Sequence, residues 1–114
     1  MDAKEIKFFV KRIFTKDLSL ESPDAPAIFD NIKSTPKIAF NLNTTITEVD
    51  DTTYDITLEI TVKAELGETV IYMVDLKQAG LFIIDGADDE LKDGFLNIRC
   101  PEVLFPYARE TISS

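Results

Sequence analysis

The chain has 114 residues, enough for one domain, and 45% of them are hydrophobic, which argues against global disorder. Its 12 basic and 21 acidic residues give a net charge of −9, a balance that repels nucleic-acid phosphates and favours basic partners. The absence of histidine excludes Ser-His-Asp and Cys-His catalysis. The chain has a single cysteine, so it cannot form an intrachain disulfide, which fits a protein of a reducing compartment.

The first predicted strand begins at Ile6 and continues to Glu21 through a bulged extension after Phe14. Simple alternation places apolar side chains on both faces, with Ile6, Phe8, Val10 and Phe14 on one and Phe9 and Ile13 on the other. Both faces are therefore expected to be partly buried. The prolines of residues 22–26 end this strand, and a short helix is predicted over residues 27–33.

The second and third predicted strands alternate cleanly between apolar and polar residues. Residues 37–47 present Ile38, Phe40 and Leu42 on one face, and residues 50–52 mark a turn. Residues 54–66 then alternate without a fault from Tyr54 to Leu66. This pattern is typical of a half-buried antiparallel strand with one solvated face.

The fourth predicted strand follows a tight connection at Gly67 and runs from Thr69 past Gly80 to Ile84. Within residues 69–76 the charged exception is Asp75, which is expected to be exposed because burying an unpaired carboxylate is costly. The acidic stretch over residues 87–93 suits a short helix or loop. Within it, residues 88–90 lack the spacing of a calcium-binding loop and fit a solvated helix start. A last helix is predicted over residues 102–113, with Pro101 in its first turn.

These elements predict an α+β fold in a single domain of residues 1–114: a four-stranded antiparallel sheet with a short crossover helix and a C-terminal helix. One short helix cannot cover all the apolar strand faces, so we expect an oligomer with an apolar binding surface. No apolar run approaches the ~20 residues of a membrane span, and the acidic N-terminus is unlike a signal peptide. A cytoplasmic protein is expected, with no membrane insertion and no binding of nucleic acid.

Three segments, in matching order and spacing, resemble the SecB family of export chaperones. They are residues 12–26, with a Thr-Lys-Asp run before a Pro-x-x-Pro; residues 64–69, followed by a kink over residues 78–82; and residues 100–112, which read CPEVLFPYARETI. The resemblance implies a SecB-like four-stranded sheet, pairing of subunits through edge strands and assembly of two dimers into a homotetramer. It implies no catalysis and no cofactor, but capture of unfolded preproteins and their delivery to SecA.

The resemblance also implies three sets of functional residues, each with a simpler alternative. Client binding is assigned to Ile38, Phe40 and Leu42, which could instead form the core of the subunit. SecA binding is assigned to Asp17, Glu21, Met73 and Asp75, where the carboxylates could be merely solubilising. The oligomer interface is assigned to Val74, Leu76, Gln78 and Tyr107, where core packing is the alternative for the three strand residues.

Two further expectations concern the C-terminal part of the chain. Cys100 precedes a proline and has no histidine to activate it, so a structural thiol is expected. The family continues past this helix into a second C-terminal helix and a polar tail, whereas this sequence stops at Ser114. A member without that helix is expected to have a more open client groove. An alternative function is a SecB-like module dedicated to one partner, such as an antitoxin. An enzyme ranks third, because the sequence shows no recognisable pair of carboxylates for acid–base catalysis.

Overall fold

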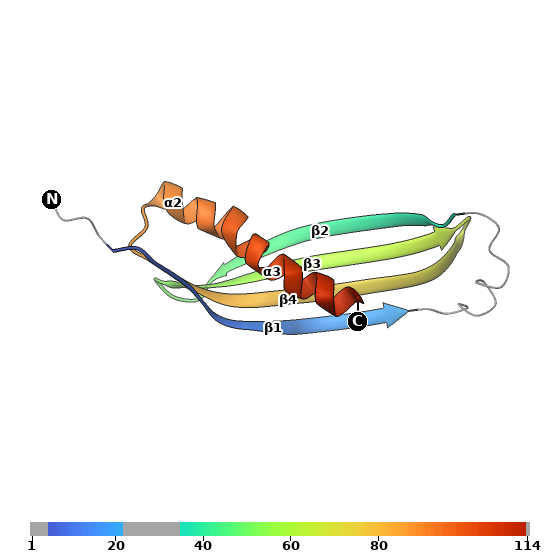
Figure 1. Cartoon of the computed structure of the whole chain (residues 1–114), viewed down its shortest axis with the longest axis horizontal. Helices are drawn as coiled ribbons and strands as arrows, with labels where there is room; N and C mark the ends of the chain where they lie inside the picture. Colours follow the sequence, from blue (N-terminus) through green and yellow to red (C-terminus); the bar gives the residue numbers. More distant parts are fainter. Residues whose placement is uncertain (1–4, 22–34, 114) are drawn as a thin grey trace.

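The computed structural model describes residues 5–21 and 35–113, which form one sheet and one helical run (Figure 1). The strands are β1 (Lys7–Glu21), β2 (Lys37–Glu48), β3 (Thr53–Leu66) and β4 (Thr69–Asp85). The helical run comprises α2 (Asp89–Gly94), η1 (Phe95–Arg99) and α3 (Cys100–Ser113). All neighbouring strands pair antiparallel in the order β1-β4-β3-β2, which confirms the predicted α+β fold. The helix predicted over residues 27–33 lies outside the described residues.

The apolar face of β3 and the helical run form the core. Four alternate residues of β3 are buried, namely Tyr54, Ile56, Leu58 and Ile60. The run contributes a row of buried side chains spaced by four residues, namely Leu96, Cys100, Leu104 and Ala108. This spacing aligns them along one face of the helix. The run crosses the sheet over β3 and β4, and β1 and β2 lie at the two edges (Figure 1). We call the covered side of the sheet the helix face and the other side the open face.

Gly80 on β4 lets the helix approach the sheet closely. A Cβ atom at this position would lie 2.7 Å from Cε2 of Phe82 and 2.9 Å from Cδ2 of Leu104. Any larger residue would therefore push α3 away from β4 or displace Phe82.

β1 departs from strict alternation. Its register with β4 shifts between Val10 and Arg12 and again between Thr15 and Asp17. The first shift inserts one extra residue, Lys11, which reverses the phase of the residues that follow. Ile13 consequently packs against the core beside Phe8, whereas Phe14 lies on the open face. The predicted partition of these side chains is wrong, because a bulge was expected only after Phe14.

The predicted helix start in the acidic stretch and the predicted last helix belong to one continuous helical run. Asp88 caps it by accepting a hydrogen bond from the Leu91 N–H at 2.8 Å, as expected for a solvated helix start. The run then continues without a break to Ser113, so Pro101 lies in the first turn of α3, as predicted, but with further helical turns before it. The preceding turn is a π-helix, in which the Cys100 N–H donates to the Phe95 carbonyl. This wider turn reduces the clash between a proline ring and the carbonyl four residues before it.

The β2–β3 turn is held by Asp50, as the sequence predicted for residues 50–52. Its Oδ1 accepts hydrogen bonds from the N–H groups of Thr52 at 3.0 Å and Thr53 at 2.8 Å. These bonds favour the carboxylate, so the pKa of Asp50 lies below its ordinary value, chiefly through the Thr52 N–H.

Candidate functional site

The apolar residues of β2 are exposed. Ile38, Phe40 and Leu42 are 63%, 56% and 45% accessible, and their partners across the register are Ala64, Val62 and Ile60 of β3. Directly opposed residues in an antiparallel pair share a face, so the three side chains lie on the helix face. They are not part of the buried core of this chain, because the helical run covers β3 and β4 and stops short of the β2 edge.

A groove lies between this strand and the last helix. Its volume is about 150 Å³, and its lining comes from β2, β3 and α3: Phe40, Ile60, Val62, Phe105, Arg109, Ile112 and Ser113. Most of this lining is apolar. The groove continues the exposed row of β2 towards the helix, so that an apolar strip along the strand and an apolar hollow beside it form one surface, which we call the β2 groove.

The other edge of the helix face is also apolar. Leu18 and Leu20 of β1 lie opposite Leu76 and Val74 of β4, and both leucines are exposed. Exposed apolar side chains therefore flank α3 on both sides. Such contiguous apolar exposure marks interaction surfaces in soluble proteins.

The predicted acidic residues meet on the open face. Glu21 lies directly opposite Met73, Ser19 lies opposite Asp75, and Asp17 lies opposite Lys77, so these six side chains share one side of the sheet. The three carboxylates are exposed, and Asp75 Oδ1 accepts a hydrogen bond from Thr61 Oγ1 at 3.0 Å. The exposure expected for Asp75 is thus observed. Sequence reasoning missed Lys77, which places a positive charge directly opposite Asp17, although the alternation of β4 could have indicated it.

Three residues predicted at the oligomer interface are buried within the chain itself. Val74 and Leu76 are buried on the helix face. Gln78 donates from Nε2 to the Phe14 carbonyl at 3.0 Å and accepts at Oε1 from Thr15 Oγ1 at 3.3 Å. Packing within the subunit therefore accounts for these residues, which was the alternative interpretation. Tyr107 of α3 is exposed and available for contact with another chain.

Cys100 belongs to the core. It is fully buried, and this burial raises the pKa of its thiol to about 12. Almost no reactive thiolate exists at neutral pH, as expected for a structural cysteine.

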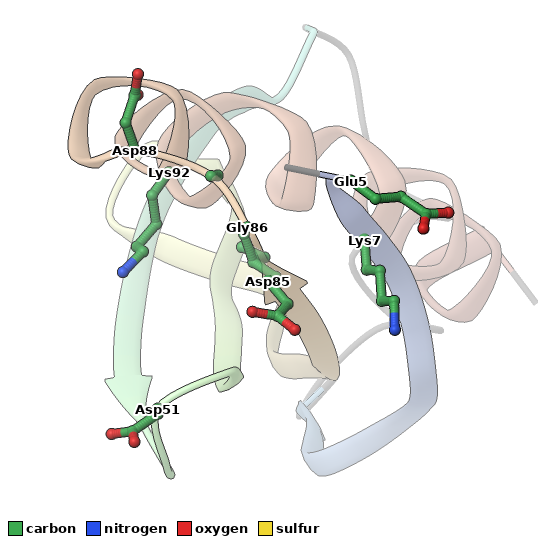
Figure 2. Close-up of a pocket in the computed structure, with 9 residues that line it drawn as sticks. Glu5, Lys7, Asp51, Asp85, Gly86, Asp88 and Lys92 are labelled. Carbon is green, nitrogen blue, oxygen red and sulfur yellow. The ribbon is translucent and has the colours of Figure 1, made fainter. Parts of the chain in front are cut away.

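A second, larger hollow is polar and lies at the opposite end of the sheet from the β3–β4 hairpin. It measures about 690 Å³ and is lined mainly by charged side chains of both signs, among them Glu5, Lys7, Asp51, Asp85 and Lys92 (Figure 2). Figure 2 shows Lys92, Asp51 and Asp85 on separate segments around this hollow. Because charged residues make up most of its lining, we do not assign client binding to this hollow.

In the part of the chain that the structure describes, no helix is both long and apolar enough to cross a membrane.

A family model described as Preprotein translocase subunit SecB matches residues 1–114. The protein-export protein SecB of Legionella pneumophila (strain Corby) is 42% identical over 110 residues, which cover 96% of this chain and 67% of the relative. The SecB of Marinobacter nauticus is 41% identical over 106 residues, which cover 93% of this chain and 64% of the relative. The chain thus spans about two thirds of the length of these relatives.

A solved structure shares the fold. The Mycobacterium tuberculosis Rv1957 SecB-like chaperone, in complex with a ChAD peptide from the Rv1956 HigA1 antitoxin, matches 91% of this chain and 77% of its own with a TM-score of 0.64. The two sequences are 15% identical, so the match concerns the fold alone. It confirms the SecB-like arrangement of a four-stranded antiparallel sheet followed by a helix.

Proposed function

The chain belongs to the SecB family of preprotein translocase subunits, and we propose that it serves protein export by holding unfolded precursor chains in the β2 groove. The observation that carries this proposal is the exposed row of Ile38, Phe40 and Leu42 beside the apolar groove. A folded protein hides its apolar side chains, whereas an unfolded precursor presents them. An exposed apolar strip therefore distinguishes the two states.

The geometry of the strip suits an extended client. Alternate residues of a strand lie about 7 Å apart, and an extended peptide repeats its side chains with the same spacing. A client segment with alternating apolar residues can thus place successive side chains between those of β2. No deeply shaped pocket is needed, which is consistent with binding many different sequences.

The test of client binding uses one matched pair of substitutions on β2. Phe40→Asp places a charge in the groove, and Asn41→Asp places the same charge on the next residue, which points to the open face. We expect Phe40→Asp to weaken binding of an unfolded precursor about tenfold or more, and Asn41→Asp to have little effect. Affinity is measured by fluorescence titration and activity by suppression of aggregation, while circular dichroism verifies the sheet. Equal binding by both variants would remove the groove assignment, and no effect of the unsubstituted protein on aggregation would remove the function.

Delivery to SecA is assigned to the open face. Asp17, Glu21 and Asp75 form an acidic surface beside Met73. Such a surface can attract a basic region of a partner at long range, and Met73 adds an apolar contact at its end beside Glu21. We expect Asp17→Lys with Asp75→Lys to lower SecA affinity and its dependence on salt. The control is Asp51→Lys with Asp93→Lys, which makes the same charge change at exposed positions away from this face. If the two double variants bind SecA alike, the open face is not the SecA site.

We place the protein in the cytoplasm.

Self-assembly is assigned to the remaining apolar surface. The exposed leucines of β1 and Tyr107 of α3 offer contacts to further copies, consistent with edge pairing into dimers and helix packing between dimers. Light scattering at several concentrations tests the expected tetramer, whose mass would be about four times 12.8 kDa. A concentration-independent monomer would contradict this assembly.

A second candidate function is service to a single dedicated partner. The solved structure with the same fold is a SecB-like chaperone bound to a peptide of an antitoxin. Breadth of binding separates the two functions: an export chaperone binds several unrelated unfolded precursors with comparable affinity, whereas a dedicated module binds one.

A further inference from the structure

The second bulge of β1 decides which of its last side chains lie on the open face. Thr15 lies opposite Gln78 and Asp17 lies opposite Lys77, so Lys16 is an extra residue between two registered pairs. This insertion sets the phase of residues 17–21 and places the acidic residues among them on the open face. Without it, the acidic residues would lie on the helix face, and the two leucines between them would lie on the open face.

Burial does not fix the register of this segment. All five side chains of residues 17–21 are exposed. A strand with one buried face resists slippage, because a slip of one residue would expose its apolar set, but a strand with both faces in solvent lacks this constraint. In a slipped register the segment would still pair with β4, with Leu18 opposite Asp75 instead of Leu76. Interactions at the bulge itself therefore select the observed register.

Gln78 holds the bulge from the helix face. It is 3% accessible, and its Nε2 donates to the Phe14 carbonyl at 3.0 Å while its Oε1 accepts from Thr15 Oγ1 at 3.3 Å. Thr111 Oγ1 of α3 donates to the same oxygen at 3.5 Å. With hydroxyl donors at its oxygen, the amide presents its nitrogen to the Phe14 carbonyl. Gln78 thus binds both residues that precede the inserted one.

An ion pair holds the inserted residue from the open face. Lys16 Nζ lies 3.0 Å from Asp55 Oδ2 of β3, and Thr57 Oγ1 donates to Oδ1 of the same carboxylate at 2.9 Å. The lysine is exposed, so solvent screens the pair and makes it the weaker of the two constraints. The bulge is therefore held on both sides of the sheet, chiefly by the buried amide.

We infer that Gln78, assisted by the Lys16–Asp55 pair, is a positioning residue that keeps Asp17 and Glu21 on the open face by holding the second bulge of β1. Its effect on a partner is indirect, because its own side chain lies on the helix face. The consequence for partner binding rests on the proposed role of the open face in binding SecA.

Disulfide trapping detects the slipped register. In a Leu18→Cys, Asp75→Cys variant the two thiols lie on opposite faces of the sheet, where they cannot form a bond. A slip of one residue would bring them opposite each other on the open face. Cys100 is fully buried and stays in place. The initial rate of intrachain disulfide formation with diamide therefore reports the population of the slipped register.

Substitutions at the bulge should raise this rate. Gln78→Met keeps a similar volume but removes the amide, and we expect an increase of about fivefold to tenfold. Lys16→Met changes an exposed side chain, so the protein should fold, and we expect an increase of about twofold to threefold. The control for general destabilisation is Ile84→Ala, which truncates a buried residue opposite Phe8 at the other end of β4 and should leave the rate unchanged. Unchanged rates in both bulge variants, or an equal increase with Ile84→Ala, would overturn the inference.

The trapped protein separates this inference from the proposed function. The disulfide fixes β1 with Asp17 away from the open face, and reduction releases it. We expect SecA to bind the oxidised protein at least about tenfold more weakly than the same protein after reduction. Equal binding of the two forms would overturn the assignment of the open face to SecA, whereas the trapping rates alone decide the role of Gln78.

Discussion

β2 and β3 share a sequence pattern but differ in burial. The two strands pair over twelve registered positions, from Lys37 with Glu65 to Glu48 with Tyr54, and both alternate apolar and polar residues. Yet Ile60 of β3 is 1% accessible, whereas Leu42 directly opposite it is 45% accessible. The difference arises because the helical run covers β3 and β4 and leaves β2 uncovered. Alternation therefore identifies the apolar face of a strand, and the neighbouring layer decides whether that face is core or binding surface.

The largest effect that would test this contrast is protection of the Cys100 thiol beneath the helix. Burial raises its pKa from 9.0 to about 12, which lowers the thiolate fraction near pH 8 about a thousandfold. We expect a thiol reagent such as Ellman's reagent to react with Cys100 at least about a thousandfold more slowly in the folded protein than in urea. Fast reaction of the folded protein would show that the helical run does not stay on β3 and β4.

Two matched truncations compare the strands directly. Ile60→Ala removes buried methyl groups and should lower the free energy of unfolding by about 2–5 kcal/mol. Leu42→Ala at the opposing position removes side-chain atoms that are largely in water, so its cost should stay below about 1 kcal/mol. Urea denaturation at equilibrium measures both, at one protein concentration so that assembly does not confound the comparison. A large loss for Leu42→Ala would mean that another chain buries β2 in solution.

A pair of glycine substitutions tests how closely the helix must approach the covered strands. Gly80→Ala inserts a Cβ into the space of Phe82 and Leu104 and should cost about 1–3 kcal/mol of unfolding free energy. Gly94→Ala lies in a helical turn with no atom within 4 Å of the new Cβ, and it should stabilise the protein by about 0.5–1 kcal/mol. Thermal denaturation should therefore shift in opposite directions for the two variants. Shifts of the same sign would contradict the close packing at Gly80.

The smallest expected effect concerns the turn that sets the β2–β3 register. Asp50→Ala removes the acceptor of two backbone N–H groups and should lower the urea midpoint at pH 7, whereas Asp51→Ala should not. Because the folded-state pKa of Asp50 is lowered, its carboxylate contributes stability above its unfolded pKa, and this contribution is lost as the pH falls through the folded value. The difference in urea midpoint between the unsubstituted protein and Asp50→Ala should thus become smaller below about pH 4. A difference that is constant down to pH 2 would exclude the carboxylate charge as its cause.

Some features of the fold were predictable because they depend on local chemistry. The alternation from Tyr54 to Leu66, the Asp50 turn and the connection at Gly67, where φ is +65°, were each visible in the sequence and are present in the structure. The phase of β1 was not, because a bulge at Lys11 has no distinctive residue type and is fixed by pairing with β4. The continuity of the helical run was also missed, since proline at position 101 ordinarily marks a first turn and the π-turn before it has no sequence signature.

The sequence by itself determined the family, the four strands and the face on which each β2 and β3 side chain points, because side-chain period and turn chemistry are local properties. Only the tertiary structure decided that Val74 and Leu76 are core while Ile38, Phe40 and Leu42 are exposed. It also brought Arg109 of α3 to the groove beside Phe40, nearly seventy residues away in sequence. The physical reason is that burial depends on which surface a helix can cover, and a single helix is narrower than a four-stranded sheet.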